Sequence, residues 1–385
     1  MSGALIISIL INAASFFGVT AISDFANNLM STVNFRELLM QWMLSFLLFA
    51  GSLTIDFSTL KSEAKTISIV TFCGVIFSTF LLGYFIYGLL ILLKHPMQLP
   101  LCFLFGALIS PTDPIAVLAT FKKLGASKKI RVLVAGESLF NDGVGIVMFY
   151  TLLHFVAGTD KPTIANISKL FCQQALGGMC LGMLIGYLAH LVIKSSKDHL
   201  ISILTTLTIT TAGYALASTL DVSGPLAMVV AGIFIGNKAQ KGSSEDKINK
   251  TLYVFWEVID EVLNAILFLL LGLELIVISA PIGVTIATIC AIPLALLSRF
   301  ISVAVPLKMI IKNNSICHQT IRILTWGGLK GGLAVALALS LPDSIPMTAR
   351  STIICMTFAI VTFSIIVQGG TVSKCLPKNN KPSSN

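Results

Sequence analysis

The chain has 385 residues, of which 55% are hydrophobic and only 11% carry a charge. Because soluble domains carry charge on about 25% of their residues, this composition excludes a soluble globular protein. It predicts one polytopic membrane domain over residues 1–385, with no soluble domain attached. The formal net charge is +9, but the basic residues lie in loops between apolar segments, so we expect a lipid bilayer rather than a nucleic acid as the partner.

Hydropathy predicts about twelve membrane-spanning helices, each close to the roughly 17–25 residues that a bilayer requires. In chain order they cover residues 4–22, 38–56, 66–93, 99–121, 130–157, 170–194, 200–220, 224–237, 251–279, 282–311, 320–341 and 348–373. The first has no basic segment before it and no convincing cleavage site after it, which favours a transmembrane helix over a signal peptide. The predicted fold class is therefore an all-α polytopic membrane protein.

The lysine and arginine residues are divided unequally between the two sets of alternating loops. Of the 26 in the chain, 19 lie in the set of loops that includes both termini and 5 lie in the opposite set. Arg299 and Lys330 are the two that lie within spans. Because cytoplasmic loops carry the excess of basic residues, both termini are expected in the cytoplasm.

Two spans in corresponding positions of the two halves are interrupted. The span 99–121 contains the string SPTDP at 110–114, and the span 320–341 contains GGLKGG at 327–332. Broken hydrophobic segments at matching positions point to a transporter built from inverted repeats. The alternative is that these prolines and glycines only kink two helices, but a charged residue inside each break favours true interruptions.

Five ionisable residues lie near the middle of otherwise apolar spans. A charge at the bilayer centre costs roughly 2.5–3.5 kcal/mol, so such residues are candidates for function. They are Asp113, Glu137, Asp142, Arg299 and Lys330.

The span 130–157 presents two polar faces. Glu137 and Asn141 are four residues apart and share one face, whereas Ser138 and Asp142 share a second face about 100° around the helix. One face can line an ion path while the other packs on the protein. Together with Asp113, the second face offers carboxylate and hydroxyl oxygens to a monovalent cation, and the carbonyl of Thr112 adds a further oxygen.

Two carboxylates in one low-dielectric site hold either protons or a metal cation, because they cannot both stay ionised and uncompensated. Competition between the two ligands is the basis of proton-coupled exchange. The three embedded carboxylates and two embedded cations leave one excess negative charge. A single monovalent cation or proton would neutralise it, which favours one-for-one, electroneutral exchange.

The two embedded cations have competing interpretations. Arg299 could be a pore cation, but an unpaired buried charge is costly, so we interpret it as the counter-ion of a carboxylate, with Glu137 as its natural partner. Lys330 could snorkel, but its position inside a break favours compensation of the helix ends of the span 320–341. No metalloprotease, serine-hydrolase or nucleotide-binding motif occurs in the sequence, so neither an enzyme nor a resident cofactor is expected.

At this point several strings resemble the monovalent cation:proton antiporters of the sodium/proton exchanger type, on the bacterial side of that family. The similarity runs nearly from end to end of the chain. The strings are FLLFAGSLTIDFSTL (46–60), GALISPTDPIAVLATFKKLG (106–125), GESLFNDGVGIV (136–147), SGPLAMVVAGIFIGN (223–237), FWEVIDEVLNAILFLLLGLEL (255–275), WGGLKGGLAVALAL (326–339) and VQGGTV (367–372).

The resemblance implies a role for each polar residue of the breaks and of the span between them. The residues that would bind the cation or proton are Asp113, Asp142, Ser138 and, through its backbone, Thr112. Glu137 and Arg299 would form a structural ion pair. Asn141 matches the branch that exchanges electroneutrally, and Lys330 stands where relatives usually carry arginine.

The resemblance also implies an architecture and a mode of action. The expected fold has a core bundle (66–157 and 282–373) with two crossed, broken helices, and dimerisation helices (1–56 and 200–279). It would work as a homodimer by alternating access in a bacterial plasma membrane. Na⁺ is the expected ion, with Li⁺ or K⁺ as alternatives. A gated cation channel is the competing class, but channels build filters from oligomeric rings or carbonyl loops around an open path.

Overall fold

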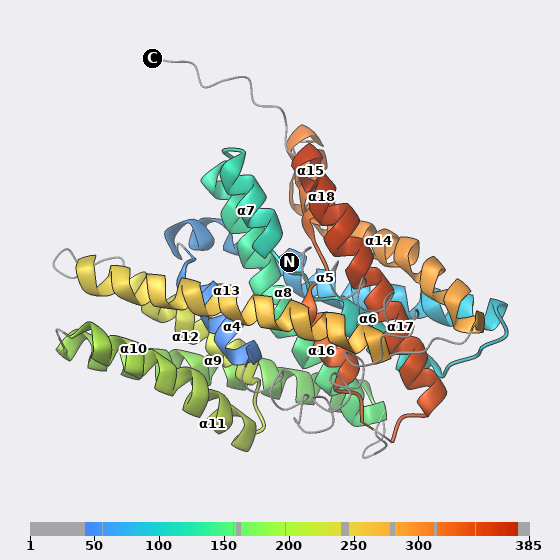
Figure 1. Ribbon diagram of the computed structural model, residues 1–385, viewed down its shortest axis with the longest axis horizontal. Coiled ribbons are helices and arrows are strands. Elements are labelled where there is room, and N and C mark those ends of the chain that lie inside the picture. The colour runs from blue at the N-terminus through green and yellow to red at the C-terminus, as the bar shows by residue number, and fades with distance from the viewer. Residues whose placement is uncertain are drawn as a thin grey trace, which may run out of the picture.

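The computed structural model describes residues 43–55, 57–156, 158, 163–196, 198–239, 246–277, 282–311, 314–342 and 344–375. These residues form an assembly of packed helices (Figure 1). One isolated antiparallel bridge joins Asp113 to Leu329. The predicted span 4–22 lies outside the described residues.

Over the described residues, every predicted span from 38–56 onward overlaps one helix or a series of consecutive helical segments. The elements are α4 (Leu44–Leu53), α5 (Phe57–Leu92), α6 (Leu99–Ile109), α7 (Ile115–Lys123), α8 (Lys128–Val156), α9 (Ile164–Ser195), α10 (His199–Thr208), η2 (Ile209–Gly213), α11 (Tyr214–Thr219), α12 (Gly224–Ala239), α13 (Asp246–Val277), α14 (Ile282–Ile310), α15 (Asn314–Gly327), α16 (Gly332–Leu339), α17 (Met347–Phe363), η3 (Ser364–Gln368), α18 (Gly369–Thr371) and η4 (Val372–Cys375). Within the described residues, six helical segments are long and apolar enough to cross a membrane.

Some helices extend beyond the predicted spans. The helix α5 begins at Phe57, ahead of the predicted start at 66, and its first turns carry Lys61 and Lys65. Glu63 in the same turns lies 2.7 Å from the Nζ atom of Lys129 at the start of α8. Hydropathy identifies only the lipid-soluble part of a helix, so a polar extension that is stabilised by such contacts is not detected.

The two predicted interruptions are present as breaks between helices. The first break separates α6 from α7 at residues 110–114, and the second separates α15 from α16 at residues 328–331. The breaks cross, because the backbone N–H of Asp113 donates to the carbonyl of Leu329 at 2.7 Å. Irregular backbone at this depth is tolerated where protein surrounds it, and most residues of both breaks are buried.

Buried apolar side chains form two main groups. The larger group draws chiefly on α5 to α8 and on α14 to α17, and the smaller group draws on α4 and on α9 to α13. Figure 1 shows α10 and α11 at one edge of the molecule, with α14 and α17 on the opposite side. Both breaks lie within the larger group.

Candidate functional site

The first break is held in place by contacts from the second break and from α8. The carbonyls of Ser110 and Pro111 accept hydrogen bonds from Lys330 Nζ at 3.0 and 3.2 Å. The backbone N–H of Thr112 donates to Asp142 Oδ1 on α8 at 3.2 Å. Buried backbone groups must find partners when a helix is interrupted, and the second break and α8 supply them here.

The end of α15 is held in a similar way. The carbonyl of Leu324, in the last turn of this helix, accepts a hydrogen bond from Arg299 Nη2 at 3.1 Å. The N–H of Leu329 donates to the carbonyl of Gly327 at 2.9 Å. A guanidinium from α14 therefore lies at the carboxyl end of the second broken span.

At the crossing, charged side chains lie beside helix ends of opposite partial charge. The carboxyl end of a helix carries partial negative charge and the amino end partial positive charge. Lys330 lies at the carboxyl end of α6 and Arg299 at that of α15. Asp113 lies two residues before the first residue of α7, and Gly331, its close neighbour, immediately precedes α16. The expectation that Lys330 compensates the ends of its own span is wrong in this detail: its ammonium reaches the end of the other broken span, because the breaks cross.

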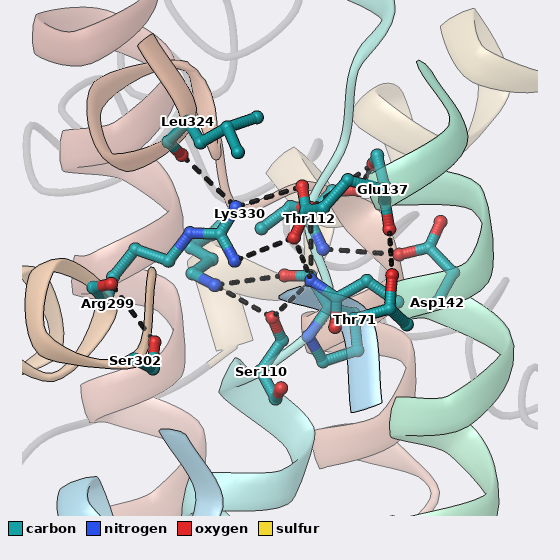
Figure 2. A network of polar contacts seen from close by, with 12 residues as sticks. Thr71, Ser110, Thr112, Glu137, Asp142, Arg299, Ser302, Leu324 and Lys330 are labelled. Atoms are coloured by element: carbon teal, nitrogen blue, oxygen red, sulfur yellow. Dashed lines mark hydrogen bonds and ion pairs between the residues drawn. The ribbon is translucent and has the colours of Figure 1, made fainter. Parts of the chain in front are cut away.

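Glu137 and Arg299 form a bidentate ion pair between α8 and α14. Arg299 Nη1 lies 2.9 Å from Glu137 Oε1, and Nη2 lies 3.0 Å from Oε2. The two side chains are only 2% and 4% exposed. The fork of the guanidinium matches the carboxylate in the arrangement that gives the strongest charge-assisted hydrogen bonds. Figure 2 shows Arg299 entering the network from one side, with Glu137 and Asp142 on α8 at the other.

Asn141 links the ion pair to the first break. Its Nδ2 atom lies within hydrogen-bonding distance of three acceptors: the carbonyl of Ser110 at 3.2 Å, Thr112 Oγ1 at 3.3 Å and Glu137 Oε1 at 3.3 Å. An ionised aspartate at this position would have no N–H to donate, so its carboxylate oxygens would face the acceptors that Asn141 now bonds. The amide is thus suited to a site that already contains three carboxylates.

Ser138 and Thr112 are mutually bonded. Thr112 Oγ1 donates to Ser138 Oγ at 3.2 Å, and Ser138 Oγ donates to the carbonyl of Thr112. A carbonyl oxygen has two lone pairs, so that of Thr112 has capacity for a second ligand. The oxygens of Ser138, Thr112 and Asp142 are therefore gathered at one place, where a cation could be coordinated.

Asp113 is packed against the second break. A Cβ atom built on Gly331 would lie 2.6 Å from Asp113 Cβ and 2.7 Å from its Oδ2, so only glycine permits this approach. Asp113 and Asp142 are both partly exposed, whereas Glu137, Arg299 and Lys330 are at most 5% exposed. The two aspartates are thus the least buried of the five embedded charges.

Several residues that hold the site carry no signal in the sequence. Thr71 Oγ1 on α5 donates to the backbone carbonyl of Glu137 at 3.4 Å, and the Ser364 hydroxyl on η3 accepts from the N–H of Lys330 at 2.8 Å. Each is one small polar residue in an apolar span, as occurs at many ordinary positions. Their role depends on packing between segments that are distant in the sequence.

Comparison with known proteins gives a consistent family assignment. The family model described as "Sodium/hydrogen exchanger, transmembrane" matches residues 2–378. The Na⁺/H⁺ antiporter NhaP of Pseudomonas aeruginosa is 38% identical over 374 residues, which cover 96% of this chain and 87% of that protein. The Na⁺/H⁺ antiporter NhaH of Halobacillus aidingensis is 32% identical over 349 residues, covering 89% and 83% respectively.

A solved structure shows the same fold. The sodium proton antiporter MjNhaP1 from Methanocaldococcus jannaschii superposes with a TM-score of 0.73 over 97% of this chain and 96% of that chain, at 19% identity. The predicted all-helical, polytopic antiporter fold is thereby confirmed, as is the family resemblance. The chain belongs to the sodium/hydrogen exchanger family and is an integral membrane transporter rather than an enzyme.

Proposed function

We propose that this protein exchanges Na⁺ for H⁺ across a membrane, and that the two ions compete for Asp113 and Asp142. One observation carries the proposal: two partly exposed carboxylates lie at the crossing of the two breaks. The nearby cations are already bonded elsewhere, Arg299 to Glu137 and Lys330 to the carbonyl end of α6. The names of the relatives support sodium and proton as the exchanged ions.

The geometry favours an exchangeable ligand at Asp142. Its Oδ1 atom accepts one hydrogen bond from the neutral N–H of Thr112. A carboxylate has about four acceptor positions, so this bond leaves capacity for a cation or a proton. A dehydrated cation would also meet Ser138 Oγ, the carbonyl of Thr112 and the carboxylate of Asp113. Competition follows because a proton on either carboxylate removes the charge that attracts the cation.

Alternating access would then couple the two ions. Carrying the site across the membrane with both carboxylates ionised would move uncompensated charge through an apolar interior, which is costly. The loaded site crosses with a cation or with a proton, and the empty site does not. Cation leaves on the side where proton enters, and exchange results.

Exchange is proposed to be one-for-one. The charges at the crossing are those of three carboxylates, one guanidinium and one ammonium, which together leave one net negative charge. One monovalent cation or one proton restores neutrality. A transmembrane potential exerts about 2.3 kcal/mol per elementary charge per 100 mV. The equilibrium cation gradient at a fixed pH gradient should therefore not change when the potential is clamped at different values.

The test is dissipation of an imposed pH gradient in proteoliposomes after addition of Na⁺, Li⁺ or K⁺ with the membrane potential clamped. The order of activity among the three ions decides between a sodium antiporter and a potassium antiporter. Cation-triggered dissipation that occurs without the clamp and disappears when the membrane potential is clamped would instead indicate a gated cation channel. No cation-dependent dissipation at all would refute the proposal.

Asp142→Asn should abolish exchange while folded protein remains in the membrane. A matched control is Asp198→Asn, because Asp198 is about half exposed and caps the N–H of Leu200 at the start of α10, a role that asparagine also fulfils. The control should exchange normally. Normal exchange by Asp142→Asn would remove this residue from the site.

We propose the division into two groups of helices, the homodimer and the orientation in the membrane from the pattern expected for the family. Segments 66–157 and 282–373 would form the moving core, and segments 1–56 and 200–279 would form the dimerisation helices of a homodimer. The excess of basic residues in one set of loops supports a cytoplasmic location for both termini in a bacterial plasma membrane. Accessibility of single cysteines introduced into loops on either side would test the orientation.

A further inference from the structure

The last span is interrupted by a π-helical turn, η3 (Ser364–Gln368), which follows α17. Single π-helical turns inside longer helices occur frequently at functional sites. The first and last residues of this turn, Ser364 and Gln368, are 0% and 2% exposed although both are polar. Burial of polar side chains requires partners; one partner lies in the second break and the other in the last turn of α15.

The two side chains satisfy one backbone group within that break and one in the helical turn before it. Ser364 Oγ accepts a hydrogen bond from the N–H of Lys330 at 2.8 Å. Gln368 Nε2 donates to the carbonyl of Trp326, in the last turn of α15, at 3.3 Å. Ser364 thus bonds to an N–H within the break. Gln368 bonds to one of the last carbonyls of α15, which have no partner within their own helix.

The same short segment carries the contacts to the ion site. The carbonyl of Leu329 accepts the N–H of Asp113, and Lys330 Nζ bonds to the carbonyls that follow α6. Ser364 therefore bonds to the backbone of Lys330, and the ammonium of Lys330 bonds to the first break. A displacement of residues 328–331 would change the position of Asp113 relative to Asp142.

The packing leaves little freedom for this segment to move alone. A cavity of about 10 Å³ lies between α14, α17 and the break, and its lining includes Arg299, Gly328, Lys330 and Gln368. This is about the space of one water molecule. Direct contacts with the last span therefore contribute to the position of the break.

We propose that Ser364 and Gln368 are positioning residues for cation binding: from the π-helical turn they fix the second break, and through it the placement of Asp113. This inference rests on the proposed exchange function. The side chains of Ser364 and Gln368 bond to the backbone of Lys330 and Trp326, so they act on the site through the second break. Their loss should weaken cation binding more than it weakens the fold.

The test compares Ser364→Ala and Ser364→Thr with the wild-type protein in proteoliposomes. Ser364→Ala leaves a buried N–H without its acceptor, and we expect the apparent KM for the cation to rise about tenfold, equivalent to about 1.4 kcal/mol. Because weaker cation binding favours the proton in the competition, activity at fixed cation concentration should shift to higher pH. Ser364→Thr retains the hydroxyl and should restore both values.

The matched control is Thr357→Val, in the same span. Thr357 is fully buried, and its hydroxyl bonds to the carbonyl of Ile353 in its own helix. Removing this hydroxyl should leave the KM and the pH profile unchanged. Stabilisation of the purified protein by added cation against thermal unfolding gives a binding readout that does not depend on transport.

The outcomes separate the two proposals. An inactive wild-type protein would refute the exchange function itself. An active wild-type protein with an unchanged KM and pH profile in Ser364→Ala would overturn the positioning role alone. Should Ser364→Ala not fold, Gln368→Met carries the same test through the carbonyl of Trp326. Failure of both variants to fold would assign the two side chains to stability and overturn the inference.

Discussion

The ion pair between Glu137 and Arg299 provides a quantitative test of how the site is held together. Glu137→Gln or Arg299→Met removes two short charge-assisted bonds and leaves the other charge buried. Removing one partner of a buried pair costs about 3–5 kcal/mol. If the two residues were independent, the double variant would lose the sum of the two single losses.

The structure predicts a much smaller loss in the double variant. Removing both charges abolishes the uncompensated charge that makes each single change costly, and replacing a buried pair by neutral residues is often close to neutral. We expect the double variant to cost no more than the milder single variant. The coupling energy should then be at least about 3 kcal/mol, at or above the upper end of the range for residues in contact.

The measurement is a double-mutant cycle on the free energy of unfolding in mixed micelles, followed by the fluorescence of the chain's 3 tryptophans. The pair Glu63–Lys129 serves as a control: its atoms lie 2.7 Å apart, but Lys129 is 67% exposed. Exposed pairs contribute about 0.2–1 kcal/mol, so Glu63→Gln and Lys129→Met should be nearly additive. Additive losses at Glu137 and Arg299 would show that the two are not energetic partners.

Three further predictions concern the breaks and the carboxylates. Gly331→Ala would place a methyl group 2.7 Å from Asp113 Oδ2 and should abolish cation-dependent exchange. The control Gly88→Ala should exchange normally, because no described atom outside its own stretch of helix lies within 4 Å of the new methyl group. Equal activity of the two variants in proteoliposomes would contradict the close approach. Lys330→Met should lose exchange, and Lys330→Arg should retain much of it, because a guanidinium can also donate to the carbonyls after α6; equal loss in both would show that the ammonium itself is required. The apparent KM for Na⁺ should rise as pH falls, because protons then occupy Asp113 and Asp142; a KM that is constant between acidic and alkaline pH would rule out competition at these carboxylates.

The positions of the helices could be predicted from the sequence because the bilayer imposes a length and a composition on every span. The breaks at 110–114 and 328–331 could be located because proline, glycine and an embedded charge coincided there. Helix ends in polar segments were not predictable. The early start of α5 at Phe57 depends on contacts such as that between Glu63 and Lys129.

The contacts across the site were only partly predictable. The assignment of Glu137 as partner of Arg299 followed from the cost of an unpaired buried charge, which leaves few choices in an apolar interior. The target of Lys330 did not follow, because charge compensation alone does not distinguish between the ends of two broken helices. Ser364 and Gln368 were not identified either, since a buried hydroxyl or amide gains meaning only from the backbone group it faces.

The distribution of partners supports the proposed exchange of ions at a site rich in charge. Arg299 is held by two bonds to Glu137 and one to the carbonyl of Leu324, and Lys330 by two bonds to carbonyls after α6. Asp142 accepts a bond from a neutral backbone N–H, which stabilises its carboxylate without supplying a charge. A lysine or arginine bonded directly to Asp142 would compete with both cation and proton. The placement of the two embedded cations at helix ends and at Glu137 therefore favours reversible binding of ions at Asp142.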